Sequence, residues 1–290
     1  MKIGAVYPQT EMNGDPAVLD AIGRAVEAIG YDHLLIYDHV AGAVHEGRVP
    51  PLTGPYDEKT PFHDPLVSLA YLAAATQRIG LATGVVILPQ RQTLLVARQA
   101  ADVDLLSGGR LRLGVGSGWN SVEYEGLGQD FHTRGERLSE QIPYLRRLWS
   151  EPVVDFKGKF DRLDRAGLVP RPKRVIPIWC GGFSEPAFRR AAKLADGFIF
   201  FEPVSNPLDG LAKVKRFLGE EGRASEDFGA DLVLQSRRPG GAGESDADRV
   251  KRWQDAGGTH ASVITLGLGF TSADQHIDHL AEVRAQLGSA

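Results

Sequence analysis

Polar residues in this sequence gather where short apolar runs end. The run from His33 to Asp38 (HLLIYD) is followed directly by His39. If such runs are parallel strands, their carboxyl ends meet at one face, where a histidine beside a ligand can donate or accept a proton. Asp38 and His39 are equally compatible with ordinary polar residues at the start of a loop. Position alone leaves both interpretations open.

Glycines interrupt or follow two further apolar runs. Gly84 lies inside the run 79–88, and a glycine within a strand indicates a bulge or the close approach of another group. The segment 114–119 (GVGSGW) superficially resembles a dinucleotide-binding loop. We reject that interpretation, because the segment lies in the middle of the chain and its third glycine is displaced. Glycines at such a position do allow a planar or phosphorylated ligand to approach the backbone.

A pair of glycines precedes a segment with helical spacing. Gly181 and Gly182 follow Cys180 and lead through Phe183 to Ser184, which stands at the N-cap position of EPAFRRAAKLA. A glycine turn at a helix N-terminus exposes N–H groups that suit a phosphate, whereas a plain N-cap is the simpler interpretation of the serine. Cys180 is the single cysteine, so it forms no internal disulfide, and its apolar neighbours indicate a buried side chain rather than a nucleophile.

Composition and missing motifs exclude several classes of function. No HExxH, CxxC, GxSxG or GxxxxGKS/T motif occurs and the eight histidines are scattered, so we expect no metal site. Lys plus Arg number 33 against 37 for Asp plus Glu, a net charge of -4, which argues against nucleic-acid binding. No apolar run approaches the roughly 20 residues of a membrane span, and no signal peptide is evident. We therefore expect a soluble, cytoplasmic protein with no membrane partner.

The elements that must position these residues alternate along the whole chain as eight strand–helix pairs. Apolar strands without strict alternation suit a parallel sheet covered by helices, so the pattern predicts an α/β fold, a single (β/α)8 TIM barrel over residues 1–290. An open doubly wound sheet is the less economical alternative. The expected strands are 3–7, 33–38, 79–88, 110–116, 176–182, 197–201, 230–236 and 262–267. The expected helices are 15–30, 64–77, 93–106, 134–149, 184–195, 206–219, 245–256 and 273–287.

Two segments depart from this alternation. Residues 39–63, after the second strand, are rich in Gly, Pro and charge. A long loop at the C-terminal face of a barrel is expected to act as a lid or as part of the pocket wall. Residues 151–175, after the fourth long helix, contain DFKGKFDRLD, which predicts a small inserted hairpin around Lys157 and Gly158.

Several linked motifs resemble the bacterial luciferase-like monooxygenase superfamily, and within it the coenzyme F420-dependent oxidoreductases of actinobacteria. The strongest are RIGLATGVVILPQRQTLLVARQAADVDLLSGGRLRLGVGSGW, EYEGLG and RGERLSEQIPYLRRLW. GYDHLLIYDHV upstream and PIWCGGFSEPAFRRAAKLADGFI downstream extend the resemblance over most of the first 200 residues. The last 90 residues match only in layout.

The resemblance implies a flavin or deazaflavin across the C-terminal mouth of a luciferase-like barrel. It implies a non-proline cis peptide at Gly84–Val85 behind the ring, and it places His39 beside the ring, where it would orient or protonate the reacting partner. The residues that it assigns to the cofactor are Gly84, Val85, Gly116, Ser117 and Gly118, together with Gly181, Gly182, Phe183 and Ser184 for the phosphate.

One position departs from a relative within that family. F420-dependent glucose-6-phosphate dehydrogenases carry a glutamate that serves as an acid where this chain has Trp119. A tryptophan cannot supply a proton in that way, so the chain is not that dehydrogenase. We place Trp119 and Asp38 in the substrate pocket, and we expect the proton to come from His39, another residue or water.

The function implied by the resemblance is an F420-dependent oxidoreductase that transfers a hydride between the deazaflavin C5 and a small organic substrate. An alternative is an FMN-dependent monooxygenase of the two-component type, which would need a flavin reductase as partner. A second alternative is a barrel that binds F420 or flavin without turnover. The resemblance also implies a homodimer paired through early helices, and residues 66–77 offer a surface of small residues for it.

Overall fold

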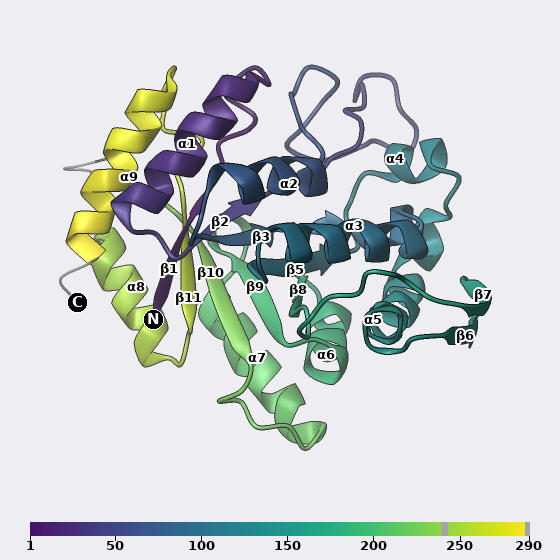
Figure 1. Ribbon diagram of the computed structural model, residues 1–290. Helices are drawn as coiled ribbons and strands as arrows, with labels where there is room; N and C mark the ends of the chain where they lie inside the picture. The colour runs from purple at the N-terminus through teal and green to yellow at the C-terminus, as the bar shows by residue number, and fades with distance from the viewer. Residues whose placement is uncertain (239–242, 288–290) are drawn as a thin grey trace.

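A ring of parallel strands forms the centre of the molecule in the computed structural model, which describes residues 1–238 and 243–287 (Figure 1). The barrel strands are β1 (Lys2–Val6), β2 (His33–Ile36), β3 (Gly80–Thr83), β4 (Val86–Ile87), β5 (Leu111–Gly116), β8 (Ile178–Gly181), β9 (Gly197–Phe201), β10 (Gly229–Gln235) and β11 (His260–Ile264). Their order is β3-β2-β1-β11-β10-β9-β8-β5-β4, and β3 also pairs with β5, which closes the ring. Because β3 and β4 are two halves of one strand, the sheet is the predicted eight-stranded parallel barrel.

Helices cover the outer face of the ring (Figure 1). They are α1 (Pro16–Ile29), α2 (Pro65–Ala75), α3 (Thr93–Leu106), α4 (Ser121–Gly126), α5 (Arg134–Ser150), α6 (Glu185–Leu194), α7 (Pro207–Glu220), α8 (Asp246–Asp255) and α9 (Ala273–Leu287). Short 3₁₀ turns cover Leu88–Gln90, Phe131–Thr133 and Glu202–Val204. Asp15 and Asp64 each accept N–H groups of the following first turn, with a proline next in the chain. The predicted Asp-Pro helix starts are therefore confirmed.

The apolar core has two layers, because successive strand residues point to opposite faces of the sheet. Val6, Leu35 and Ala82 lie side by side on paired strands and belong to the cluster inside the barrel. Their neighbours Leu34 and Leu81 belong to the larger cluster between the sheet and the helices. The barrel interior is thus filled by side chains near its C-terminal mouth.

A polar network fills the N-terminal end of the barrel. The Arg112 guanidinium donates to Asp231 Oδ2 at 2.7 Å and lies over the Trp179 ring at 4.3 Å. Ser262 Oγ donates to Asp231 Oδ1 at 2.9 Å and lies 2.7 Å from His33 Nε2. Burial alone would raise the pKa of the Asp231 carboxyl, but Arg112 and His33 hold that pKa well below its usual value. Asp231 is therefore ionised within a buried ion pair.

Small residues make room for the rings of this network. A Cβ atom at Gly4 would overlap the His33 imidazole, and one at Gly197 or Gly229 would overlap the Trp179 indole. Glycine at these strand positions therefore allows two large side chains to lie across the interior of a narrow barrel.

Most predicted elements are confirmed, including the inserted hairpin, whereas the bounds of the last strand are wrong and one short helix was missed. The inserted hairpin consists of β6 (Val154–Lys157) and β7 (Arg162–Ala166), and its turn over residues 158–161 lies where it was predicted. The last strand begins at His260 and ends at Ile264, because the chain turns at Gly267 with a positive φ of 79°. The stretch before Arg134, which we expected to be irregular, contains α4, capped where the Asn120 side chain accepts the Val122 N–H.

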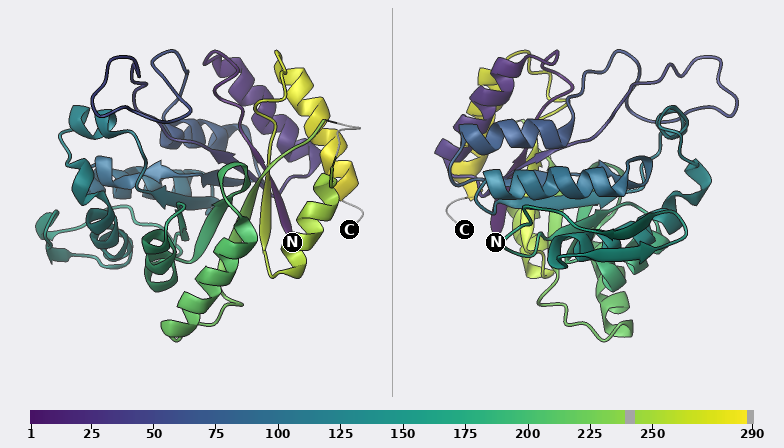
Figure 2. Two further views of the ribbon diagram at one scale, coloured as in Figure 1. Left: turned by 180° about the vertical axis from the view of Figure 1, so that it is seen from behind. Right: turned by 45° about the vertical axis from the view of Figure 1, so that its right-hand side comes forward.

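Residues 37–64 form the long loop after β2, as predicted, without helix or strand. The loop extends beyond the barrel beside α4, while the hairpin of β6 and β7 packs at the outer side of α5 (Figure 2). No helix in the two described ranges is long and apolar enough to cross a membrane.

Candidate functional site

The third barrel strand carries a bulge at the mouth. Ala82 pairs with Arg112 and Val86 pairs with Val115. Between these two pairs the interrupted strand contains one residue more than β5, which defines a β-bulge. The Thr83 hydroxyl donates to the Gly114 carbonyl at 2.7 Å and accepts the Gly114 N–H at 2.8 Å. This single hydroxyl replaces the backbone bonds that the bulge removes, so β3 and β4 remain one strand of the barrel.

The bulge brings predicted cofactor residues from three strands together. The Gly84–Val85 peptide is cis, as the resemblance implied. A Cβ atom at Gly116 would lie 2.5 Å from Val85 Cγ2, and one at Gly181 would lie 2.9 Å from Val85 Cγ1. Half-buried Val85 packs on the cluster inside the barrel. The glycines thus fit the Val85 side chain into the mouth, and Val85 forms part of its floor.

The segment after β5 is fixed on two sides. The Tyr124 hydroxyl donates to the Ser117 carbonyl at 2.8 Å. Gly118 has a φ of 61°, in the left-handed region, and a Cβ atom there would lie 2.8 Å from Ile87 Cγ2. Glycine is therefore required at this position by conformation and by space.

The segment before α6 presents unused backbone donors. Within the described ranges, the N–H groups of Gly182, Phe183 and Ser184 donate to no protein acceptor. Ser184 stands at the N-cap of α6 as predicted, but its hydroxyl accepts no N–H of the first turn. A row of open amides at a helix N-terminus has the donor set that a phosphate needs.

His39 forms a buried hydrogen bond with a carboxylate that we did not single out from the sequence. His39 Nδ1 lies 2.9 Å from Glu123 Oε1, which also accepts the N–H groups of Val40 and Ala41 at 3.0 and 3.2 Å. Burial would raise the pKa of Glu123, but these bonds and that from Gln90 hold its pKa below the usual value. Glu123 is the first residue of the motif EYEGLG, and this motif was the only indication of its importance in the sequence. The pairing could not be predicted, because Glu123 and His39 are 84 residues apart in the chain.

Three aromatic side chains surround the His39 imidazole. The ring centroids of Tyr56, Phe62 and Trp119 lie 5.1, 4.8 and 5.4 Å from that of His39. A Cβ atom at Gly54 would overlap the Trp119 indole, so the loop backbone lies directly on this ring. We call Tyr56, Phe62 and Trp119 the ring cluster. Trp119 lies beside His39, which agrees with a pocket position, and the loop supplies two residues that the sequence did not single out.

Asp38 has a different place from the one we expected. Its carboxylate accepts the Ile87 N–H at 2.8 Å and binds Arg91 at 2.6 Å, and its side chain is 0% exposed. Arg91 also binds Asp64 at 2.8 Å. The placement of Asp38 in the substrate pocket was therefore wrong, because no part of the side chain is open to a ligand. Asp38, Arg91 and Asp64 form a bridge, the Arg91 bridge, that joins the two ends of the long loop.

Two other features are separate from this site. Burial raises the pKa of the Cys180 thiol to about 12, so this side chain is a buried thiol and not a nucleophile. Within residues 1–238 and 243–287, no group of three or more His, Cys, Asp or Glu side chains could hold a metal ion.

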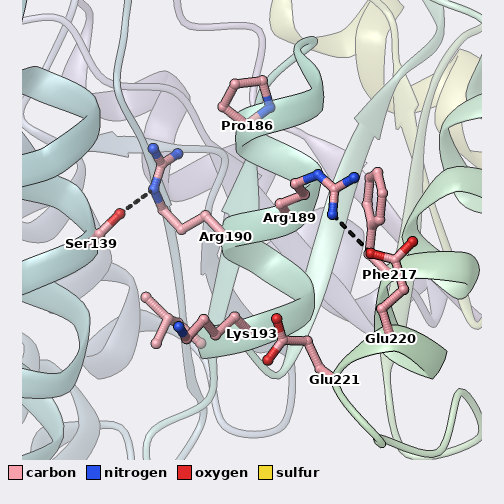
Figure 3. Close-up of a pocket in the computed structure, with 9 residues that line it drawn as sticks. Ser139, Pro186, Arg189, Arg190, Lys193, Phe217, Glu220 and Glu221 are labelled. Carbon is pink, nitrogen blue, oxygen red and sulfur yellow. Dashed lines mark hydrogen bonds and ion pairs between the residues drawn. The ribbon is translucent and has the colours of Figure 1, made fainter.

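A cleft of about 520 Å³ lies on the outer side of the barrel along α6 (Figure 3). Arg189 binds Glu220 of α7 at 2.8 Å on one side of it, and Arg190 binds Ser139 of α5 at 2.9 Å on the other. The lining includes no histidine and none of the residues predicted for the cofactor. We therefore place the candidate active site at the barrel mouth.

Comparisons with known proteins agree with this fold. A profile described as luciferase-like monooxygenase matches residues 3–237. An uncharacterized protein of Mycobacterium tuberculosis (strain H37Rv) is 35% identical over 209 residues, which cover 70% of this chain and 72% of that protein. The pyrimidine monooxygenase RutA of Acinetobacter baylyi is 30% identical over 64% of this chain, but the match spans only 51% of RutA. The structure of an F420-dependent secondary alcohol dehydrogenase superposes with a TM-score of 0.77 at 18% identity, over 99% of this chain and 98% of that one.

Proposed function

Because this chain belongs to the luciferase-like monooxygenase family, we propose that it is an F420-dependent oxidoreductase acting on a small organic substrate. The observation that carries the proposal is the pair formed by His39 and Glu123 at the barrel mouth. Hydride exchange with an alcohol or carbonyl must be accompanied by proton exchange at the substrate oxygen, and an imidazole held by a carboxylate is suited to that task.

The residues at the mouth fit a deazaflavin in kind. Val85 offers an apolar surface, flanked by Gly116 and Gly181, against which a planar ring can lie. The open amides of Gly182, Phe183 and Ser184 would hold the phosphate. When bound, the deazaflavin would supply the hydride chemistry at its C5, and the protein supplies position and electrostatics.

The chain's own contribution is to hold a proton and to keep water away. In this proposal, His39 Nε2 exchanges the proton of the substrate oxygen. The ring cluster covers His39, whose side chain is 8% exposed, and the loop backbone at Gly54 lies against Trp119. This cover limits the access of water. Trp119 contributes no proton, so it shapes the space for the substrate.

The test of cofactor choice is equilibrium binding of F420 and FMN to the purified protein, followed by fluorescence. We expect F420 to bind more tightly. A clear preference for FMN would refute the proposal, and so would the absence of binding of either cofactor.

The test of His39 is the variant His39→Ala, with His132→Ala as the matched control because His132 is exposed and lies outside the mouth. We expect turnover to fall by about 10²–10⁴ while F420 affinity is unchanged, which is the usual range for a lost general acid–base. Equal turnover in both variants would rule out the role of His39.

An FMN-dependent monooxygenase is the second candidate, and the 30% identity to the pyrimidine monooxygenase RutA favours a monooxygenase reaction. The tricyclic ring of FMN would lie on Val85, and its phosphate would bind the same open amides of Gly182, Phe183 and Ser184. This candidate requires a reductase partner and reaction with oxygen. Preference for FMN in the binding experiment, followed by oxygen consumption with reduced FMN, would establish it in place of the F420 enzyme.

We also propose that the protein is a homodimer. Apolar side chains are exposed on α2, where Val67 is 65% and Tyr71 is 50% exposed, and on α3, where Leu95 is 52% exposed. The two helices lie side by side on one face (Figure 1). A second copy of the chain would cover this face, since contiguous apolar surface is uncommon on monomers.

A further inference from the structure

Glu123 can only be an acceptor towards the start of the long loop. Its Oε1 atom receives the N–H groups of Val40 and Ala41, and a backbone N–H can only donate. His39 Nδ1 lies 2.9 Å from the same oxygen. An oxygen that already accepts two hydrogen bonds offers no proton to the imidazole, so Nδ1 must carry the hydrogen and donate it.

The other oxygen of Glu123 is also engaged. Oε2 accepts the Gln90 side-chain amide at 3.1 Å, and the Glu123 side chain is only 1% exposed. Four donors, three from residues 39–41 and one from Gln90, therefore converge on one carboxylate. Such an arrangement favours the ionised form of Glu123, in agreement with its lowered pKa.

The second nitrogen of His39 is left for a ligand. Among the described residues, the only hydrogen bond of the His39 side chain is the one between Nδ1 and Glu123, and Nε2 is not one of the fully buried atoms that lack a partner, so it is accessible to a ligand. Tyr56, Phe62 and Trp119 surround the imidazole and present ring atoms to it rather than charged groups. The protein therefore offers Nε2 no alternative proton partner within this enclosure.

We propose that Glu123 is a positioning residue that fixes His39 as the Nδ1–H tautomer and leaves Nε2 to exchange the substrate proton. In the direction of oxidation, Nε2 would take the proton of a substrate hydroxyl as the carbon–oxygen bond becomes a carbonyl, and a bound deazaflavin would supply the acceptor for the hydride. Glu123 keeps its charge throughout and stabilises the imidazolium that results. The identity of the reacting molecule rests on the proposed function, but the tautomer does not.

The tautomer can be measured without cofactor or substrate, by ¹⁵N NMR of the imidazole nitrogens in labelled protein. The His39 signals are assigned by their loss in His39→Ala. In neutral His39 we expect Nδ1 to be protonated, with a slowly exchanging proton, and Nε2 to be unprotonated. Protonated Nε2 in the native protein would overturn the inference.

Three variants separate positioning from simple packing. Glu123→Gln keeps an oxygen that accepts from Nδ1, and the Gln90 carboxamide, whose oxygen has no partner, can turn to accept the new amide, so the Nδ1–H tautomer should persist. Glu123→Ala removes the acceptor, and His39 should change to the Nε2–H form. Glu125→Ala is the matched control, because Glu125 lies on the same helix and is exposed.

The outcomes distinguish this inference from the proposed function. Persistence of the Nδ1–H form in Glu123→Ala would overturn the positioning role, even if the protein binds F420. The expected tautomer change in a protein that does not bind F420 would support the role of Glu123 and refute the proposed function. If Glu123→Ala does not fold, the native spectrum and that of Glu123→Gln test the positioning role. Loss of the Nδ1–H form in a folded Glu123→Gln would overturn it, because an acceptor oxygen at position 123 would then not fix the tautomer.

Discussion

The polar network at the N-terminal end of the barrel offers a test of stability that is independent of catalysis. Asp231 is the only carboxylate bound to the Arg112 guanidinium within residues 1–238 and 243–287. The change Asp231→Asn keeps the shape of the side chain and removes its charge. It therefore leaves a cation in the barrel interior without a counter-ion, where its desolvation is no longer offset.

The magnitude follows from the contacts. Removing one partner of a buried ion pair costs about 3–5 kcal/mol, because the remaining charge stays buried. The bond from Ser262 to Asp231 at 2.9 Å changes from a charge-assisted bond to an ordinary one, which adds about 1 kcal/mol. We therefore expect Asp231→Asn to lower the free energy of unfolding by about 4–6 kcal/mol.

The measurement is chemical denaturation followed by tryptophan fluorescence and by circular dichroism. Asp255→Asn is the matched control, since it makes the same change in an ion pair with Lys251 in which the side chains are 63% and 67% exposed. The control should cost less than about 1 kcal/mol, as exposed pairs do. The double variant Arg112→Met with Asp231→Asn should recover part of the loss, because it removes the uncompensated cation.

F420 binding provides the second half of the test. The network lies at the end of the barrel opposite the mouth, so, on the proposed function, folded Asp231→Asn should have the same F420 affinity as the unaltered chain. A loss of stability no larger than in Asp255→Asn would refute the reasoning about buried charge. Equal stability losses in the single and double variants would refute the assignment of the loss to Arg112.

Three further predictions concern other parts of the molecule. Burial lowers the pKa of His260 to about 3 and that of His276 to about 4, below the ordinary 6.5, so on acidification the unfolded chain binds these protons first. The free energy of unfolding, measured by urea denaturation, should therefore fall as the pH drops from 6.5 towards 4, by up to about 1.4 kcal/mol per pH unit for each histidine, and a flat profile would contradict this. Light scattering should give about 63 kDa, twice 31.4 kDa, for the native protein and 31.4 kDa for Leu95→Glu, whereas a native monomer would exclude the dimer. Cys180 should react with a thiol reagent only after unfolding, because its thiol is buried with a pKa of about 12, and fast labelling of the native protein would contradict that placement.

The barrel could be predicted from the sequence because its signals are local. Asp-Pro pairs start α1 and α2, and β-rich apolar runs end in glycines and polar residues, so each element is specified by its own residues. The predicted bounds of an element were wrong where pairing with a neighbouring strand determines them. His260 extends the last strand because it pairs with Lys2 of β1, and no residue near His260 in the sequence indicates that pairing.

The site could be predicted only in part, because long-range contacts determine the use of each polar residue. The glycines around Val85 were found from local pattern and resemblance. The pairing of His39 with Glu123 and the engagement of Asp38 by Arg91 join residues 84 and 53 positions apart. Asp38 and His39 are adjacent in the sequence, but their adjacency did not indicate which of the two side chains faces the mouth.

The Arg91 bridge makes the long loop an exchangeable part of the protein. One guanidinium holds both ends of the loop, so changes of sequence or length between these ends should not alter the barrel. The entropic cost of closing such a loop rises by only about 0.6 kcal/mol when its length doubles. Insertions, deletions or grafts between residues 42 and 61 should therefore leave the barrel folded. Variants of this chain with another segment here are expected to accept other molecules while the contact between His39 and Glu123 stays in place.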